Sequence, residues 1–140
     1  MSEQVKIDIT VPNQTKYLGM IGRIGESLAY SLKNYQGNRR QFAYQLNLVL
    51  TEALTNAMCH GNNCDPDKEV RVSIFASDHD LIIKVFDQGQ GFDIKALAKL
   101  RACPNDEGGR GIKIIFKLMD QVKYNQEGDN NVLEMTKHLH

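Results

Sequence analysis

The order of the predicted strands and helices is the feature that most limits the folds open to this chain. Residues 5–11 alternate apolar and polar side chains, which is typical of a half-buried strand. Helical spacing follows over residues 15–35 and 39–60, and again over residues 112–119. Two hairpins complete the pattern, 70–76 with 81–86 and 121–126 with 132–136, the second turning at 127–131. Because strands and helices come in blocks, we predict an α+β two-layer sandwich, with helices on one face of a mixed, mostly antiparallel sheet.

Length and composition narrow the class of protein. The 140 residues fit a single domain spanning 1–140, and 41% apolar with 24% charged residues is close to a globular average. Seventeen basic and seventeen acidic residues cancel, which argues against a direct nucleic-acid partner. No apolar run approaches the roughly 20 residues that cross a membrane. The N-terminus lacks a signal-peptide pattern, so we expect a cytoplasmic protein whose three cysteines are free thiols.

Two polar residues interrupt the apolar pattern of the helix predicted over residues 39–60. Glu52 and Asn56 are four residues apart, so they share one face of that helix, and His60 extends the same stripe. An amide oxygen is a hard, neutral ligand suited to Mg²⁺. A carboxylate one turn away can accept a proton from a hydroxyl that attacks a phosphoryl group. A solvated helix face would carry the same residues, so this pair alone leaves both interpretations open.

A first glycine cluster follows the strand predicted over residues 81–86. The sequence DQGQG puts Asp87 at the strand end, where its carboxylate can accept a hydrogen bond from an exocyclic amine such as that of adenine. Gly89 and Gly91 allow backbone angles that other residues resist, and they let a ligand approach the main chain. A surface turn has a similar composition, so this motif is also not decisive. We expect residues 91–109 to form a mobile flap.

A second glycine cluster, Gly108, Gly109 and Gly111, stands immediately before the apolar helix of residues 112–119. A glycine-rich turn that leads into a helix makes a phosphate cradle from free backbone N–H groups and the helix dipole. Arg110 adds a positive charge to this GGRGI segment, which ends at Ile112. A flexible hinge with a solvated arginine is the alternative interpretation of Arg110.

In this order, the three motifs resemble the ATP-binding boxes of the GHKL superfamily, which includes gyrase, Hsp90, histidine kinases and MutL. Within it, the chain is similar to the bacterial anti-sigma-factor serine kinases along essentially its whole length. EALTNAMCH (52–60) matches their N-box, DQGQGF (87–92) their first glycine box, and EGGRGI (107–112) their second. The ending EMTKHL (134–139) resembles their last strand, in which a threonine completes the adenine pocket; Thr136 occupies that place.

The resemblance implies a Bergerat-type fold that binds ATP, with Mg²⁺ held by Asn56. It further implies that Glu52 is the base that activates a serine or threonine hydroxyl on an anti-sigma-factor antagonist. Asp87 would read adenine, and the glycines of both boxes would act as hinges or cradle the nucleotide. The chain departs from the sporulation kinases just ahead of the second box, where Asp106 and Glu107 stand in place of a lid arginine.

The function predicted on this basis is that of an ATP-dependent serine/threonine kinase and anti-sigma factor. Such a protein binds a sigma factor or similar partner and phosphorylates its antagonist. An ATP-binding, partner-switching module without kinase activity is the main alternative, and a lone ATPase domain is a weaker one. The resemblance also implies a homodimer, for which the first strand and first helix are our candidate surface.

Overall fold

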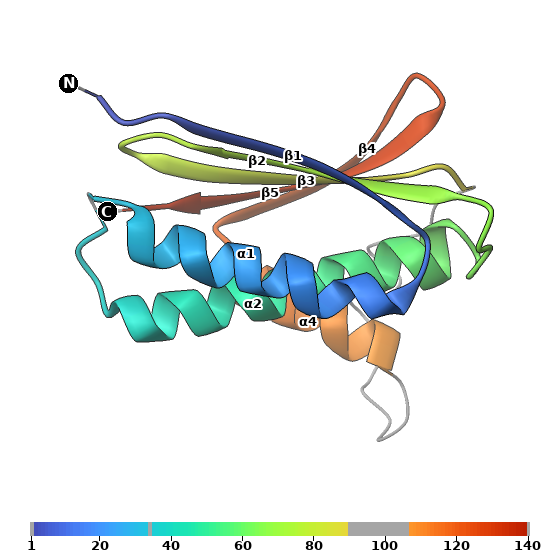
Figure 1. Ribbon diagram of the computed structural model, residues 1–140, viewed down its shortest axis with the longest axis horizontal. Coiled ribbons are helices and arrows are strands. Elements are labelled where there is room, and N and C mark those ends of the chain that lie inside the picture. The colour runs from blue at the N-terminus through green and yellow to red at the C-terminus, as the bar shows by residue number, and fades with distance from the viewer. Residues whose placement is uncertain (1, 34, 90–106, 140) are drawn as a thin grey trace.

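A five-stranded antiparallel sheet covered on one face by helices makes up the computed structural model (Figure 1). The structure describes residues 2–33, 35–89 and 107–139, and of residues 107–110 the backbone only. The elements in chain order are β1 (Val5–Pro12), the 3₁₀ turn η1 (Thr15–Tyr17), α1 (Leu18–Ser31), α2 (Arg39–Asn56), the π-helical turn η2 (Ala57–Gly61), β2 (Glu69–Ala76), β3 (Asp80–Asp87), α4 (Glu107–Leu118), β4 (Gln121–Glu127) and β5 (Asn130–His138).

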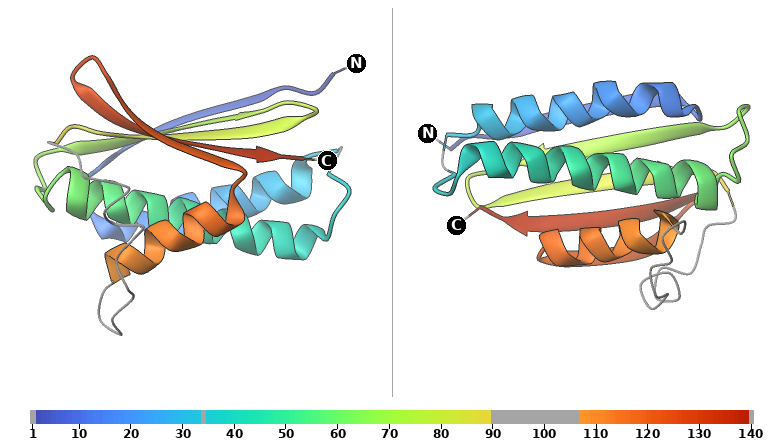
Figure 2. Two further views of the ribbon diagram at one scale, coloured as in Figure 1. Left: turned by 180° about the vertical axis from the view of Figure 1, so that it is seen from behind. Right: turned by 90° about the horizontal axis from the view of Figure 1, so that it is seen from below.

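The strand order in the sheet is β1-β2-β3-β5-β4, and every pairing between these neighbours is antiparallel. Helices α1, α2 and α4 lie side by side across one face of the sheet, with α2 in the middle (Figure 2). The predicted α+β sandwich is therefore confirmed. Among the described residues, no helix combines the length and apolar character needed to span a membrane.

The core lies between the sheet and the helix layer, and the strands reach it by alternation. In β2 every second side chain is buried, beginning with Val70, and β3 contributes Leu81, Ile83 and Val85 to the same face. Helix α2 supplies the other side of this core, including the fully buried Leu50 and Leu54. Helix α2, at the centre of the layer, is thus held by the sheet as well as by α1 and α4.

Two glycines let α1 approach α2 closely, as their spacing of three suggested. A Cβ on Gly22 would lie 2.5 Å from Oδ1 of Asn47, and a Cβ on Gly25 would lie 2.5 Å from Cδ1 of Leu50. A larger side chain at either position would force Asn47 or Leu50 to shift. The close approach fixes the position of α2, which carries the first candidate motif.

The observed boundaries correct three details of the sequence-based prediction. Helix α2 does not run to His60 as a regular α-helix, because its last turn widens into the π-helical η2. Helix α4 begins at Glu107, so residues 107–109 belong to a helix and not to the predicted flap. The rest of the predicted flap, with the helical character noted over residues 94–102, lies outside the described residues. The last hairpin turns at Gly128 and Asp129 alone, which makes β5 longer than predicted.

A pH-sensitive contact joins the start of β3 to the end of β5. His138 and Asp80 are cross-strand partners, and Nδ1 of the imidazole lies 2.7 Å from Oδ1 of the carboxylate. This hydrogen bond raises the pKa of His138 above its ordinary value of 6.5. The contact therefore stabilises the fold fully below pH 6.5, and the stabilisation is lost as the pH rises through the raised pKa.

We expect Asp80→Asn to lower the pKa of His138 toward the ordinary histidine value, because the amide offers no negative charge to the imidazolium. The measurement is an NMR titration of the histidine ring signals in the wild type and the variant. The His138 signal should move, and the resonance of His60, which lies in η2 and not in the β3–β5 pair, serves as the internal control. An unchanged His138 titration in Asp80→Asn would contradict the assigned contact.

Candidate functional site

Glu52 and Asn56 lie one turn apart at the C-terminal end of α2, as the sequence predicted. Asn56 is 1% exposed, and its Nδ2 donates a hydrogen bond to the backbone oxygen of Glu52 at 2.9 Å. Its Oδ1 is buried and has no hydrogen-bond partner within the described part of the chain. A buried polar atom without a partner costs about 1–3 kcal/mol. The amide oxygen is therefore suited to a ligand such as a hard metal ion.

Gly111, which directly follows the first turn of α4, packs against this pair. A Cβ on Gly111 would overlap with Oε2 of Glu52 and would lie 3.4 Å from Nδ2 of Asn56. Glycine therefore lets α4 lie this close without displacing the end of the Glu52 side chain. The first four N–H groups of an α-helix have no acceptor within the helix. Those of α4 belong to Glu107 and the three residues after it, immediately before Gly111.

The second glycine motif is thus part of a helix rather than a turn ahead of one, which corrects the predicted phosphate cradle. Gly108 and Gly109 belong to the first turn of α4, and the Arg110 side chain lies outside the described part. Ile112, predicted as part of the binding segment, is fully buried in the hydrophobic core. Its side chain packs in the core and holds α4 there, so any ligand contact of Ile112 is limited to its backbone.

Asp87 ends β3 and is 1% exposed. Its Oδ1 accepts hydrogen bonds from the backbone N–H of Gly89 at 3.2 Å and from Nδ2 of Asn131 at 2.8 Å. Its Oδ2 accepts a hydrogen bond from the Tyr124 hydroxyl at 3.3 Å. A carboxylate offers about four lone-pair sites. These contacts hold the carboxylate in one orientation and leave acceptor capacity on Oδ2 for a ligand.

Two glycines bring the end of α2 onto the loop after Asp87. A Cβ on Gly61 would overlap with the Asp87 carboxylate, and a Cβ on Gly89 would overlap with the carbonyl oxygen of Gly61. The π-helical turn η2 places Gly61 at this point. Both motifs thus meet at one edge of the molecule, where α2 and β3 end. Gly91, the other glycine of the first box, lies outside the described residues.

The structure does not bring Thr136 to this site, which corrects the prediction that it completes the adenine pocket. Asp87 pairs with Asn131, whereas Thr136 pairs with Ile82 near the other end of β3. Side chains alternate between the two faces of a strand. Asn131 shares the helix-covered face with the buried Leu133 and Met135, so Thr136 points to the opposite face.

Asn131 holds the position beside Asp87 that was predicted for Thr136. Its Nδ2 donates to Oδ1 of Asp87 and also to the carbonyl oxygen of Gly89 at 2.7 Å. Sequence reasoning missed it because the run 127–131 was interpreted as a turn. The signal available was the GD pair at Gly128 and Asp129, which is sufficient for a two-residue hairpin and puts Asn131 in the strand.

Cys59 is partly buried in η2 and Cys64 is exposed, and neither forms a disulfide within the described residues. Cys103 lies outside these residues. Within the described ranges, no group of three or more histidine, cysteine or acidic side chains is arranged to hold a metal ion. His60 also lies in η2 and is exposed.

We expect Gly61→Ala and Gly89→Ala each to destabilise the fold by about 1–3 kcal/mol, because the added methyl group overlaps with fixed atoms. Gly19→Ala is the matched control, since a Cβ there meets nothing closer than 3.9 Å and should stabilise α1 by up to about 1 kcal/mol. Urea unfolding of the three variants measures the difference. Equal stabilities for all three would show that the end of α2 does not pack on the loop after Asp87.

Comparison with known proteins agrees with this geometry. The family model described as a histidine kinase-like ATPase domain matches residues 22–137. The serine-protein kinase RsbW of Listeria monocytogenes is 30% identical, over 96% of this chain and 87% of its own. RsbW of Oceanobacillus iheyensis is 28% identical, over 91% of this chain and 83% of its own. The anti-sigma F factor of Anoxybacillus flavithermus is 29% identical, over 68% of each chain.

Solved structures share the fold. A chain of the SiaB–SiaC complex from Pseudomonas aeruginosa superposes with a TM-score of 0.61 at 15% identity, over 94% of this chain and 89% of its own. The histidine kinase domain of a blue-light-activated kinase from Erythrobacter litoralis gives 0.50 at 20% identity, over 92% of this chain and 62% of its own. A domain of the histidine kinase-like ATPase (GHKL) type implies ATP binding. The chain belongs to this family and is a distant relative of the RsbW kinases and anti-sigma factors.

Proposed function

We propose that this protein is an ATP-dependent serine/threonine kinase and anti-sigma factor of the bacterial cytoplasm. It would bind a sigma factor or a similar protein and phosphorylate that partner's antagonist. The names of its relatives, serine-protein kinase RsbW and anti-sigma F factor, support both halves of this proposal. The observation that carries it is the buried Oδ1 of Asn56, which has no hydrogen-bond partner in the described part of the chain and lies one helical turn from Glu52.

Asn56 is the residue that would hold Mg²⁺. A lone amide oxygen suits this ion, which takes few protein ligands and completes its shell with phosphates and water. When bound, Mg²⁺ would neutralise charge on the nucleotide phosphates. The backbone N–H groups in the first turn of α4 would add to that neutralisation, since this turn directly precedes Gly111, which lies against Glu52 and Asn56.

Glu52 is the residue that would move a proton. Its side chain is partly exposed, so a hydroxyl of a protein substrate can reach its carboxylate. The carboxylate would accept the proton of a serine or threonine hydroxyl as the oxygen attacks the terminal phosphoryl group. Asn56 and Gly111 support this role, because both contact the segment that carries the carboxylate and limit where it can lie.

Asp87 would read the base of the nucleotide. Its Oδ1 already accepts two hydrogen bonds, whereas its Oδ2 accepts one from Tyr124 within the described part of the chain. The remaining acceptor site can take the exocyclic amine of adenine. Asn131 takes the place first assigned to Thr136 and keeps Asp87 oriented for this contact.

We expect Glu52→Gln to lower the rate of phosphotransfer by about 10²–10⁴-fold with little change in ATP affinity, because the amide cannot accept the proton. Asn56→Ala should weaken ATP binding in the presence of Mg²⁺ by more than about tenfold, or 1.4 kcal/mol. The measurements are radiolabel transfer from ATP to candidate antagonists that carry an acceptor serine, and calorimetric titration with ATP.

Glu26→Gln and Asn47→Ala are the matched controls, because both residues lie away from the site. Nδ2 of Asn47 donates a hydrogen bond to Oε2 of Glu26 at 3.0 Å and so joins α2 to α1. Both should keep phosphotransfer near the wild-type rate. Phosphotransfer at wild-type rate in Glu52→Gln would overturn the assigned base. ATP binding without transfer to any candidate would instead favour the partner-switching module that has no kinase activity.

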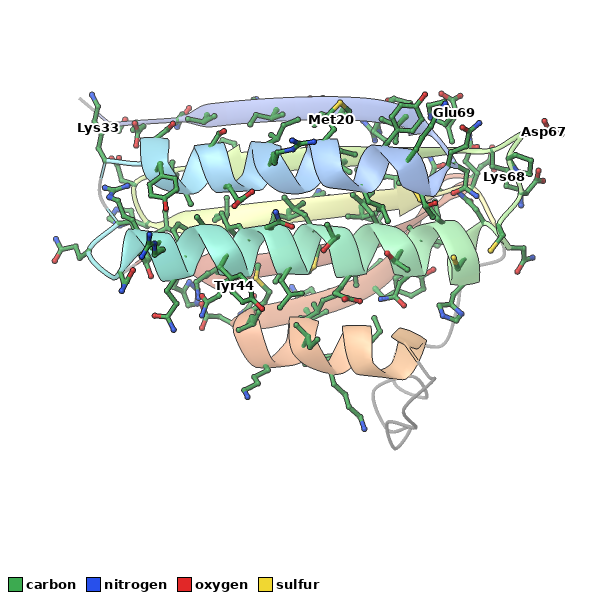
Figure 3. All side chains as sticks on the ribbon, turned by 60° about the horizontal axis from the view of Figure 1, so that its bottom comes forward. Met20, Lys33, Tyr44, Asp67, Lys68 and Glu69 are labelled. Atoms are coloured by element: carbon green, nitrogen blue, oxygen red, sulfur yellow. The ribbon has the colours of Figure 1, made fainter. Side chains whose placement is uncertain are left out.

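The homodimer that we propose uses β1 and α1. β1 is an edge strand of the sheet, and an open groove of about 470 Å³ lies between it and α1. The groove is largely apolar, with Ile7 on its strand side and Ile24 on its helix side. Met20, which is 44% exposed, lies at this groove on the side of α1 that faces β1 (Figure 3). Exposed apolar edges of this kind are usually covered by a partner.

We expect the wild type to sediment as a dimer at micromolar concentration and Met20→Glu to shift it to a monomer, because the charge would be buried in an apolar contact. Tyr44→Glu is the matched control: Tyr44 is 66% exposed on α2, on the outer face of the helix layer (Figure 3). It should leave the dimer intact. A monomeric wild type in analytical ultracentrifugation would contradict the proposed dimer.

A further inference from the structure

A buried pair of amide side chains joins three distant segments beside the base-reading residue. Asn13 follows β1 and is 6% exposed, and Asn62 follows η2 and is 0% exposed. Nδ2 of Asn62 donates a hydrogen bond to Oδ1 of Asn13 at 3.2 Å. The third segment is the loop after β3, which begins at Gln88. Nothing in the roles assigned to Glu52, Asn56 and Asp87 uses this pair.

Every hydrogen-bonding group of the Asn62 side chain is occupied. Nδ2 donates to Asn13 and to the backbone oxygen of Glu69 at 3.1 Å, and Oδ1 accepts the backbone N–H of Gln88 at 2.7 Å. Nδ2 of Asn13 is likewise used twice, by the backbone oxygens of Met58 at 3.2 Å and Asp65 at 3.0 Å. A buried polar network in which each member is satisfied holds its segments rigidly.

The network acts on the residue that follows Asp87. Besides its backbone contact to Asn62, Gln88 accepts the backbone N–H of Glu69 on its side-chain Oε1 at 2.9 Å. Asp87 itself is still paired in the sheet, opposite Asn131. Its carboxylate is therefore held between a strand on one side and a pinned residue on the other. Gly61, the neighbour of Asn62, packs on the same carboxylate.

The position demands asparagine for a chemical reason. The site needs two donors and one acceptor within a short side chain. Aspartate would keep the acceptor for Gln88 but would put a negative charge against two oxygens, Oδ1 of Asn13 and the Glu69 carbonyl. Alanine would leave the partly buried N–H of Gln88 without this partner. The π-helical geometry of η2, in which the Asn62 N–H bonds to the Ala57 oxygen at 2.8 Å, brings Asn62 to this point.

We propose that Asn62 is a positioning residue for recognition of the nucleotide base. It acts through Gln88 on Asp87, and so sets the preference for a base that carries an exocyclic amine. Asn13 supports it from the end of β1. This inference rests on the proposed function, because it takes Asp87 as the residue that reads the base.

The test compares ATP with inosine triphosphate, which has a carbonyl group where adenine has its amine. The wild type should bind ATP at least about tenfold more tightly, because Asp87 can pair only with the amine. Asn62→Ala should reduce this preference to less than about threefold, chiefly by weakening ATP binding, since a displaced carboxylate loses the amine contact. Calorimetric titration of the full chain with each nucleotide measures both affinities.

Two further variants separate positioning from stability. Asn47→Ala removes a half-buried amide that joins α1 to α2, so it should lower stability and keep the preference for ATP. Asn13→Ala removes one acceptor of the Asn62 amide and so should loosen its contact with Gln88, lowering the preference and the protection of the Gln88 N–H, but less than Asn62→Ala does. Amide hydrogen exchange adds a readout without nucleotide: Asn62→Ala should speed exchange at the Gln88 N–H by at least about tenfold while the core amides of β3 stay protected.

The outcomes distinguish this inference from the function on which it rests. A wild type that binds both nucleotides equally would refute the base contact of Asp87, and the inference with it. A wild type that prefers ATP, together with an Asn62→Ala variant that keeps the full preference, would overturn the inference and leave the proposed function standing. If Asn62→Ala does not fold, Asn13→Ala with an unchanged preference and unchanged Gln88 exchange would overturn it equally.

Discussion

The contact between Gly61 and the loop after Asp87 is the interaction on which the site depends. Neither glycine of this contact, Gly61 or Gly89, tolerates a side chain, because a Cβ on either would overlap with the other segment. The contact joins the end of the central helix to the end of a central strand. Glu52 and Asn56 belong to the helix and Asp87 to the strand, so their relative positions are set by two residues that have no functional groups of their own.

Helix α2 divides its surface between two tasks. Leu46, Leu50 and Leu54 face the core and are almost completely buried, which fixes the helix on the sheet. Glu52 and Asn56 occupy the end of the same helix, where α4 replaces the sheet as the neighbour. Oδ1 of Asn56 lies buried at this end and has no hydrogen-bond partner among the described residues, and it is the atom that we propose for a ligand. The chemistry is thus located where the helix leaves the core.

Local patterns predicted the elements well because their periods are properties of the backbone. Alternation identified β1, and β-branched and aromatic residues on either side of a turn identified β2 and β3. Apolar spacing identified α1 and α2 with their approximate ends. The same patterns failed where a neighbour decides. Thr136 was assigned to the correct strand but to the wrong face and the wrong end, because the register of β5 is set by its pairing with β3. Asn131, the residue actually beside Asp87, was counted as part of a turn that is only two residues long.

By itself, the sequence determined the α+β class, the single helix that carries Glu52 and Asn56, and the place of Asp87 at a strand end, because each depends on short-range periodicity or on adjacent residues. Only the tertiary structure decided which residues touch. It brought Gly61 onto Gly89, Gly111 onto Glu52, and Asn62 onto Gln88, across separations that no local period encodes. Contacts between distant segments depend on strand register and helix packing, which the whole core fixes together.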